Sequence, residues 1–194
     1  MMQIQTKKLG QLFIFLVISF VCSSCSTTPK IQYQTVLQKK LPNNISVSIN
    51  AFNDEREEMD RIVLGTVQNG YGMDVGDVNA PPELFSQVKN ALNDELKNSG
   101  YTLTAGKADL IISATLTEIV CDVHESTSAQ ITIKFKLMDG DKKVMDHAYH
   151  GENSKFILPV NCSKPLNKAI QNLMGEFVSD LNRYVSENSP KKAA

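Results

Sequence analysis

The sequence predicts an α+β domain, with a mostly antiparallel sheet and two amphipathic helices packed on one face of it. Three stretches alternate apolar and polar residues, the pattern of half-buried strands, around residues 45–51, 110–116 and 131–137. Two other stretches repeat apolar residues every three or four positions, as amphipathic helices do, over residues 84–96 and 166–185. The order of these stretches along the chain favours helices on one face of a sheet.

The first half of the domain is expected to contain a strand, a loop and a helix. The strand alternates Ile45, Val47, Ile49 and Ala51 with small polar residues. Residues 65–82 contain several glycines and are expected to form a long surface loop, the kind of segment that often carries binding residues. The helix after it has Pro82 near its start and Gly100 as its stop signal.

The second half is expected to form an antiparallel meander followed by a helix. Alternating strands around residues 110–116 and 131–137 are followed by a weaker run at 144–149. Asp139-Gly140 between the last two is a hairpin signal, because glycine adopts the positive φ that such turns need. The final helix is expected to begin at Ser163, a capping residue, with Pro165 in its first turn.

The N-terminus contains the three regions of a secretory signal in the correct order. Lys7 and Lys8 precede a mostly apolar run over residues 12–21, and the small residues Ser23 and Ser24 follow it. The apolar run is about half the length of roughly 20 residues that a membrane-spanning helix needs. It therefore predicts a cleaved signal and not a permanent span.

The tetrapeptide Cys-Ser-Ser-Cys at 22–25 resembles the lipobox of bacterial lipoproteins. This resemblance implies that Cys25 receives a diacylglyceryl thioether and becomes the first residue after cleavage. Cys22 fits less well because bulky residues precede it, and the alternative is an ordinary cleaved signal with an incidental cysteine. In Gram-negative lipoproteins an Asp after the lipidated cysteine commonly marks inner-membrane retention. Ser26 at that place implies the periplasmic face of the outer membrane.

We therefore expect a cleaved signal peptide, a lipidated tether and one folded domain. The predicted segments are a signal peptide at 1–24, a lipidated tether at 25–40, a single α+β domain at 41–188 and a disordered tail at 189–194. The formal net charge of −1 becomes more negative when the signal is removed. That charge argues against nucleic acid as a partner.

Three cysteines remain after cleavage of the signal. With Cys25 lipidated, Cys121 and Cys162 are an even pair in an oxidising compartment, so a disulfide between them is the simplest prediction. The alternative is two unpaired, buried thiols. A metal site is disfavoured, because neither cysteine has a histidine or another cysteine at ligand spacing.

The stretch from Val47 to Arg56, VSINAFNDER, together with Leu64-Gly65, Tyr71-Gly72 and Ala108-Asp109-Leu110, resembles the YajG family of bacterial lipoproteins. The similarity extends over nearly the whole mature chain. That family is described as envelope lipoproteins without an established activity. The resemblance thus implies a location and a fold, and no mechanism.

Asp54, Arg56 and Tyr71 are the candidate binding or structural residues. Asp54 can accept backbone hydrogen bonds in a turn, and the planar guanidinium of Arg56 can hold a carboxylate or carbonyl groups. In the structural interpretation this pair fastens the end of a strand, and Asp54→Ala costs on the order of 1 kcal/mol. In the functional interpretation Arg56 binds a ligand carboxylate. Tyr71 is the expected contact residue of the 65–82 loop.

No sequence motif specifies an enzyme, a cofactor or a metal. His147 and His150 are three apart, and residues at that spacing on a strand face opposite sides, so they are not expected to share a metal ion. His124, His147 and His150 are expected to be solvated or to lie at an edge. The leading hypothesis is a non-catalytic envelope lipoprotein, held to the membrane by lipid, that binds a protein, glycan or lipid-derived ligand through a sheet edge or the 65–82 loop. The alternatives are an auxiliary subunit of an envelope transport or lipid-trafficking complex and, more remotely, an envelope hydrolase whose triad assembles only in space.

Overall fold

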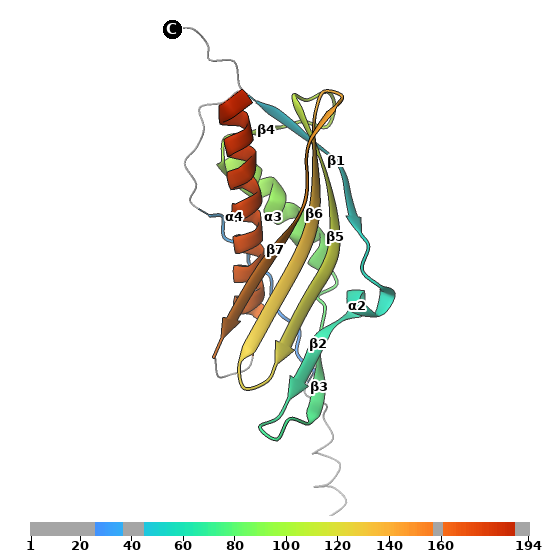
Figure 1. The fold of residues 1–194 in the computed structure, drawn as a ribbon. Helices are drawn as coiled ribbons and strands as arrows, with labels where there is room; N and C mark the ends of the chain where they lie inside the picture. The colour runs from blue at the N-terminus through green and yellow to red at the C-terminus, as the bar shows by residue number, and fades with distance from the viewer. Residues whose placement is uncertain (1–25, 37–44, 157–160, 189–194) are drawn as a thin grey trace, which may run out of the picture.

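The computed structural model describes residues 26–36, 45–156 and 161–188, which form one mixed sheet of seven strands with helices beside it (Figure 1). The strands are β1 (Ser46–Asp54), β2 (Val63–Gln68), β3 (Asp74–Asn79), β4 (Thr102–Leu103), β5 (Leu110–Val123), β6 (Thr127–Asp139) and β7 (Lys142–Lys155). The helices are α2 (Glu58–Ile62), α3 (Leu84–Asn98) and α4 (Ser163–Asn188). The fold is α+β, with a third, short helix that the apolar pattern does not predict.

Strands β5, β6 and β7 form the predicted antiparallel meander. Each pairs with the next along nearly its whole length. The turn between β6 and β7 contains Gly140 at a φ of 56°, a conformation that favours glycine. The alternating pattern and the Asp139-Gly140 signal therefore predicted this half of the sheet correctly.

The expectation of a mostly antiparallel sheet is wrong on the other side of β5. On the side of β5 away from β6, the first half of β5 pairs in parallel with β1. The last residue of β5, Val123, pairs in parallel with Val67 of β2. Strand β4 is parallel to β1 as well. Apolar alternation reports which face of a strand is buried and carries no information on strand direction. Here the direction follows from the long connection between β1 and β5, which includes α3.

The expected surface loop at 65–82 is also wrong, because most of it is a β-hairpin. Strands β2 and β3 pair antiparallel, and the turn between them spans residues 69–73. Gly65 lies inside β2, where a Cβ would overlap the backbone carbonyl of Cys121 on β5. Glycine at this position permits close approach of two strands. It obscures the alternation by which β2 could have been recognised.

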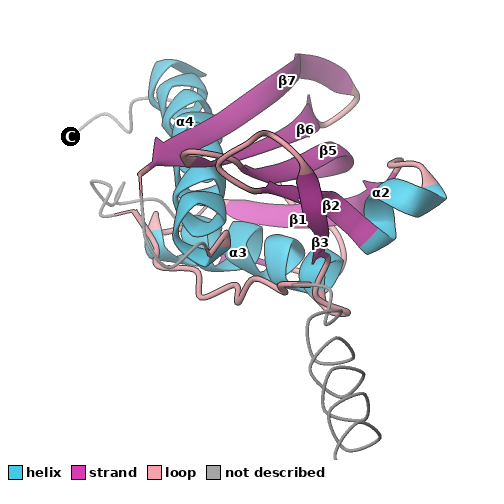
Figure 2. Ribbon diagram, turned by 90° about the horizontal axis from the view of Figure 1, so that it is seen from below, coloured by secondary structure: helices cyan, strands magenta, loops and turns pink. Residues whose placement is uncertain are grey.

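Helices α3 and α4 lie on the same face of the sheet (Figure 2). The core between α4 and the sheet contains a cluster of three aromatic rings. Phe135 of β6 stacks on Phe177 of α4 with ring centroids 3.9 Å apart, and Tyr149 of β7 meets both rings edge-on at 5.8 and 5.6 Å. Aromatic pairs in these arrangements contribute beyond their buried area. This cluster fixes α4 across β6 and β7.

Gly151→Ala is expected to destabilise the domain by about 1–3 kcal/mol, the usual effect of overpacking a close contact. Gly151 lies in β7, where a Cβ would overlap the backbone carbonyl of Ala169 and press on Leu173, both in α4. Urea unfolding followed by circular dichroism measures the change. Gly106→Ala is the control, because nothing lies within 4 Å of a Cβ there. Equal stability of the two variants would contradict the close packing of β7 on α4.

Candidate functional site

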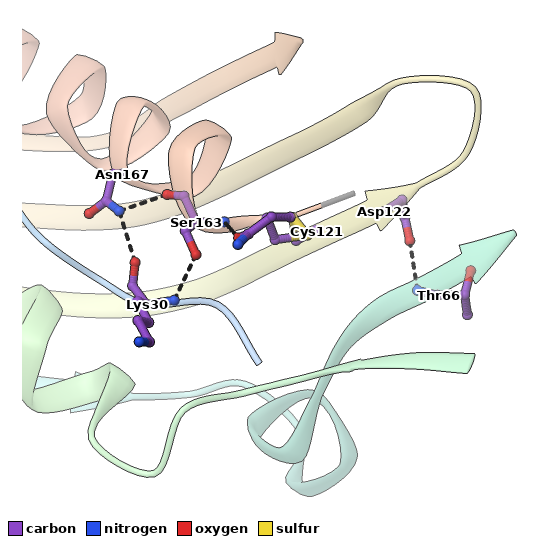
Figure 3. The surroundings of a disulfide bond; sticks show 8 residues. Lys30, Thr66, Cys121, Asp122, Ser163 and Asn167 are labelled. Carbon is purple, nitrogen blue, oxygen red and sulfur yellow. Dashed lines mark hydrogen bonds between the residues drawn. A yellow bond between two sulfur atoms is a disulfide. The ribbon is translucent and has the colours of Figure 1, made fainter. Parts of the chain in front are cut away.

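Cys121 and Cys162 form a disulfide, as the cysteine count predicted. Cys121 lies near the end of β5 and Cys162 immediately precedes α4, with their Cα atoms 6.2 Å apart. Both residues are fully buried. The bond fastens the start of α4 to the centre of the sheet. Figure 3 shows it between a Lys30–Ser163 contact and an Asp122–Thr66 contact.

Residues 26–28 lie along the free edge of β3. The amide of Thr27 donates to the carbonyl of Asp77 at 3.1 Å, and the amide of Asn79 donates to the carbonyl of Thr27 at 2.9 Å. The side chain of Asn79 also donates to the hydroxyl of Ser26. Thr27 thus bridges to Val78 in the parallel direction. The first described residues are held on the sheet.

The chain then runs along a polar stripe of α4. The Lys30 amide donates to Ser163 Oγ at 2.8 Å, and the Gln32 amide donates to Asn167 Oδ1 at 2.8 Å. One turn further on, the Gln171 side chain donates to the Gln34 carbonyl. Ile31 and Tyr33 alternate with these contacts and pack against the core. Residues 30–34 are therefore an extended segment docked on the helix.

Glu95 of α3 holds the end of this segment. It is fully buried within the apolar stripe of the helix. The Tyr33 hydroxyl donates to Glu95 Oε2 at 2.7 Å, and the Val36 amide donates to the same oxygen at 3.0 Å. Burial and this hydrogen bond raise the pKa of Tyr33 well above its ordinary value of 10.0, so the phenol remains a donor.

Asp54 and Arg56 form a bidentate pair at the end of β1. Arg56 Nε and Nη2 donate to the two carboxylate oxygens of Asp54 at 2.9 and 2.8 Å, and Nη1 donates to the carbonyl of Asp60 at 2.9 Å. The side chain of Arg56 is only 3 % exposed. Arg61 adds contacts from its guanidinium to the carbonyls of Arg56 and Asp54. All three guanidinium nitrogens of Arg56 thus donate to acceptors within the protein. This arrangement supports the structural interpretation of the Asp54–Arg56 pair.

The Asp54 carboxyl stays ionised over a wide pH range. Burial alone would raise the pKa of Asp54, but the hydrogen bonds and positive charge of Arg56, with a smaller contribution from Arg61, lower it below its ordinary value of 3.8. A charged carboxylate is thus maintained as the partner of a buried cation.

Tyr71 lies at the turn of the β2–β3 hairpin and is 91 % exposed. The turn is built around Asn69, whose side chain accepts the amides of Tyr71 and Met73. The hairpin turn and the β5–β6 turn together line a surface cavity of about 410 Å³ that includes His124. His124 itself bonds to the side chain of Gln68. Tyr71 is thus on the hairpin turn, whereas the Asp54–Arg56 pair is at the end of β1.

A second surface cavity, of about 670 Å³, lies between the docked segment and the start of α4. The exposed ammonium groups at its rim belong to Lys30, Lys164 and Lys168, and the other lining residues are neutral polar ones. Such a charge distribution favours an anionic ligand over a cationic one.

In the part of the chain that the structure describes, no helix has the length and apolar character needed to cross a membrane.

No protein-family model and no curated relative matches the sequence. Among solved structures, the chain is similar to protein XCC0632 from Xanthomonas campestris, described under the family model DUF330, with a TM-score of 0.54 and 11 % identity over 84 % of this chain and 99 % of that one. It is also similar to the hypothetical protein CT253 from Chlamydia trachomatis, with a TM-score of 0.51 and 11 % identity over 75 % and 100 % of the two chains. This chain shares their fold.

A lipoprotein, GNA1162 from Neisseria meningitidis, aligns with 10 % identity over 74 % of this chain and 99 % of that one. Its TM-score of 0.39 is too low to establish a common fold. These comparisons do not name the YajG family, so that resemblance stays a sequence-based expectation.

The structure joins two of the predicted pairs, Cys121 with Cys162 and Asp54 with Arg56. Cys25 lies outside the described residues, as does the tail at 189–194. The docking of residues 26–36 was not predicted in sequence, although two signals for it existed. Ser163, Asn167 and Gln171 recur at four-residue spacing, which places them on one face of α4, and Glu95 interrupts an otherwise apolar stripe.

Proposed function

We propose that the protein is a non-catalytic lipoprotein of the bacterial envelope, anchored through Cys25 at the periplasmic face of the outer membrane, with a binding or assembly role. The observation that carries this proposal is the order of charged, apolar and small residues that ends at Cys25. Two or three acyl chains on one cysteine suffice for stable anchoring, since each buried methylene contributes about 0.8 kcal/mol.

Two structural observations support the proposal. The Cys121–Cys162 disulfide fits an exported protein, because disulfides persist in oxidising compartments. Contacts with the domain begin at Ser26, directly after the proposed lipidation site. Lipid on Cys25 would therefore hold the domain close to the membrane.

The binding role is supported by surfaces that remain accessible. Lys134 and Lys136 of β6 are exposed and alternate with buried residues such as Phe135, which packs against α4, so they belong to the opposite face of the sheet. The cavity rimmed by Lys30, Lys164 and Lys168 has space and charge for an anionic group of a protein, glycan or lipid-derived ligand. Crosslinking in intact envelopes followed by affinity purification identifies the partner that occupies such a surface.

Cys25→Ala is expected to abolish lipidation and to move the protein from the membrane fraction to the soluble fraction or leave it as an uncleaved precursor. Mass spectrometry of the N-terminal peptide and fractionation of cell envelopes measure both effects. Cys22→Ala is the matched control, because it removes the neighbouring cysteine and leaves Ser23, Ser24 and Cys25 in place. A membrane-bound protein whose Cys25 carries no lipid would refute the anchor.

A further inference from the structure

Four of the six large apolar side chains that are exposed in the described residues lie at one end of the sheet, and the other two are on α2. Tyr71, Met73 and Val75 lie on the β2–β3 hairpin at exposed fractions of 91, 58 and 42 %. Phe156, which is 75 % exposed, directly follows β7. Lys155 pairs with Thr127 beside the β5–β6 turn, so Phe156 lies at the same end as the hairpin (Figure 1).

The three hairpin residues lie close together in sequence at the exposed end of the hairpin. Tyr71 and Met73 are in the turn, and Val75 is the second residue of β3. Gly72 and Asp74 fall between them. Only Val67 of the hairpin pairs with β5, so the turn projects beyond the body of the sheet. Solvent contact of three neighbouring apolar side chains is unfavourable unless another surface covers them.

The direction of the N-terminal segment points to what covers them. Thr27 pairs with Val78 in parallel, so Ser26 lies on the side of Thr27 that faces Asp74 and the hairpin turn. Asp74 is four positions before Val78, about 13 Å of strand. Cys25 is two peptide units before Thr27, so their Cα atoms are at most about 8 Å apart. The proposed lipid attachment is therefore within this reach of the β3 edge that begins at the apolar turn.

We propose that the β2–β3 hairpin lies in the interfacial layer of the membrane that holds Cys25, with Tyr71 and Met73 inserted beside the lipid headgroups. This inference rests on the proposed lipidation of Cys25. Tyrosine prefers the membrane interface, where its ring is in apolar surroundings and its hydroxyl stays hydrated. Asp74, Asp77 and Glu125 nearby carry negative charge, so apolar burial and not attraction to anionic lipid drives the insertion.

The sequence contains no tryptophan, and Tyr71→Trp therefore introduces a single tryptophan at the hairpin turn, which can be excited selectively over the tyrosines. The full-length variant is expressed, processed in cells and extracted from membranes, and its Cys25 is checked by mass spectrometry. It is then reconstituted into vesicles of phosphatidylethanolamine and phosphatidylglycerol containing a brominated phosphatidylcholine. We expect a blue-shifted emission that loses most of its intensity when the bromines lie near the headgroup end of the acyl chains, both at low and at high salt.

Asp141→Trp is the matched control, since Asp141 lies exposed in the β6–β7 turn, at the opposite end of the long strand β6. Its emission is expected to stay red-shifted and unquenched in the same vesicles. Equal emission of Tyr71→Trp and Asp141→Trp in lipidated, membrane-bound protein would overturn the insertion and leave the lipoprotein proposal intact. An unmodified Cys25 in the membrane-extracted protein would overturn the proposed anchor and this inference with it.

Discussion

Asp54→Ala is expected to lower the free energy of unfolding by about 3–5 kcal/mol, because removal of one partner leaves a buried charge uncompensated. The side chain of Arg56 is 3 % exposed. In the variant, Nε and Nη2 of Arg56 would lose the carboxylate oxygens that accept their hydrogen bonds. This effect exceeds the roughly 1 kcal/mol expected for a single turn hydrogen bond. Urea unfolding measures the difference.

The matched control is Asp146→Ala. Asp146 also forms an ion pair, in which Lys143 Nζ lies 2.8 Å from Asp146 Oδ2. The lysine side chain, however, is 53 % exposed. Solvent screens exposed ion pairs, which therefore add little stability, so this variant should unfold almost like the wild type. Unchanged stability of Asp54→Ala combined with lost partner binding would instead favour a ligand role for Arg56.

The same pair predicts an acid-dependent part of the stability. The pKa of Asp54 is lower in the folded protein than its ordinary value of 3.8. A lowered folded pKa contributes stability above the unfolded value, and this contribution is lost as the pH falls through the folded pKa. The stability difference between wild type and Asp54→Asn should therefore narrow below pH 3.8.

Removal of the disulfide by Cys121→Ala with Cys162→Ala is expected to destabilise the protein by about 4 kcal/mol on the chain-entropy model. The two cysteines are 41 positions apart in sequence, and the loop between them includes β6 and β7. Without the bond the unfolded chain regains the freedom of that loop. The shift in urea midpoint measures the loss.

Reduction of the wild type provides the control for this double variant. A reducing agent should lower the midpoint of the wild type toward that of the double variant and leave the double variant unchanged. A wild type that is insensitive to reduction in unfolding urea, where the bond is accessible, would mean that the protein carries two free thiols.

The parts of the fold that the sequence predicted are those with one exposed face and regular spacing. Strand β6 alternates throughout, and β5 alternates on both sides of the irregularity at Thr117-Glu118, because one face of each strand is covered by helices. Helix α4 shows its apolar stripe for the same reason. Strands β2 and β3 escaped prediction because both are short and contain a glycine, and β3 also lies at the edge of the sheet. Strand direction could not be predicted from periodicity at all.

The two residue pairs of the candidate site could be predicted from the types of their side chains and their places in the sequence. Cys121 and Cys162 could be paired by counting, and Asp54 and Arg56 are near enough in sequence to meet in one turn. The docking of residues 30–34 on α4 depends on partners 133 to 137 positions away, such as Ser163 for Lys30. Contacts at that separation form only when the whole topology is known.

The docked segment has a mechanical consequence. If Cys25 is anchored as proposed, a force pulling the folded domain away from that anchor would first load the Thr27 contacts with β3, then those with α4, and last those of Tyr33 and Val36 with Glu95. Each hydrogen bond contributes only about 0.5–1.5 kcal/mol net, so they would yield one after another. Once peeled away, the eleven residues 26–36 span at most about 36–40 Å when extended. The connection could thus lengthen under tension while the sheet and its disulfide stay folded.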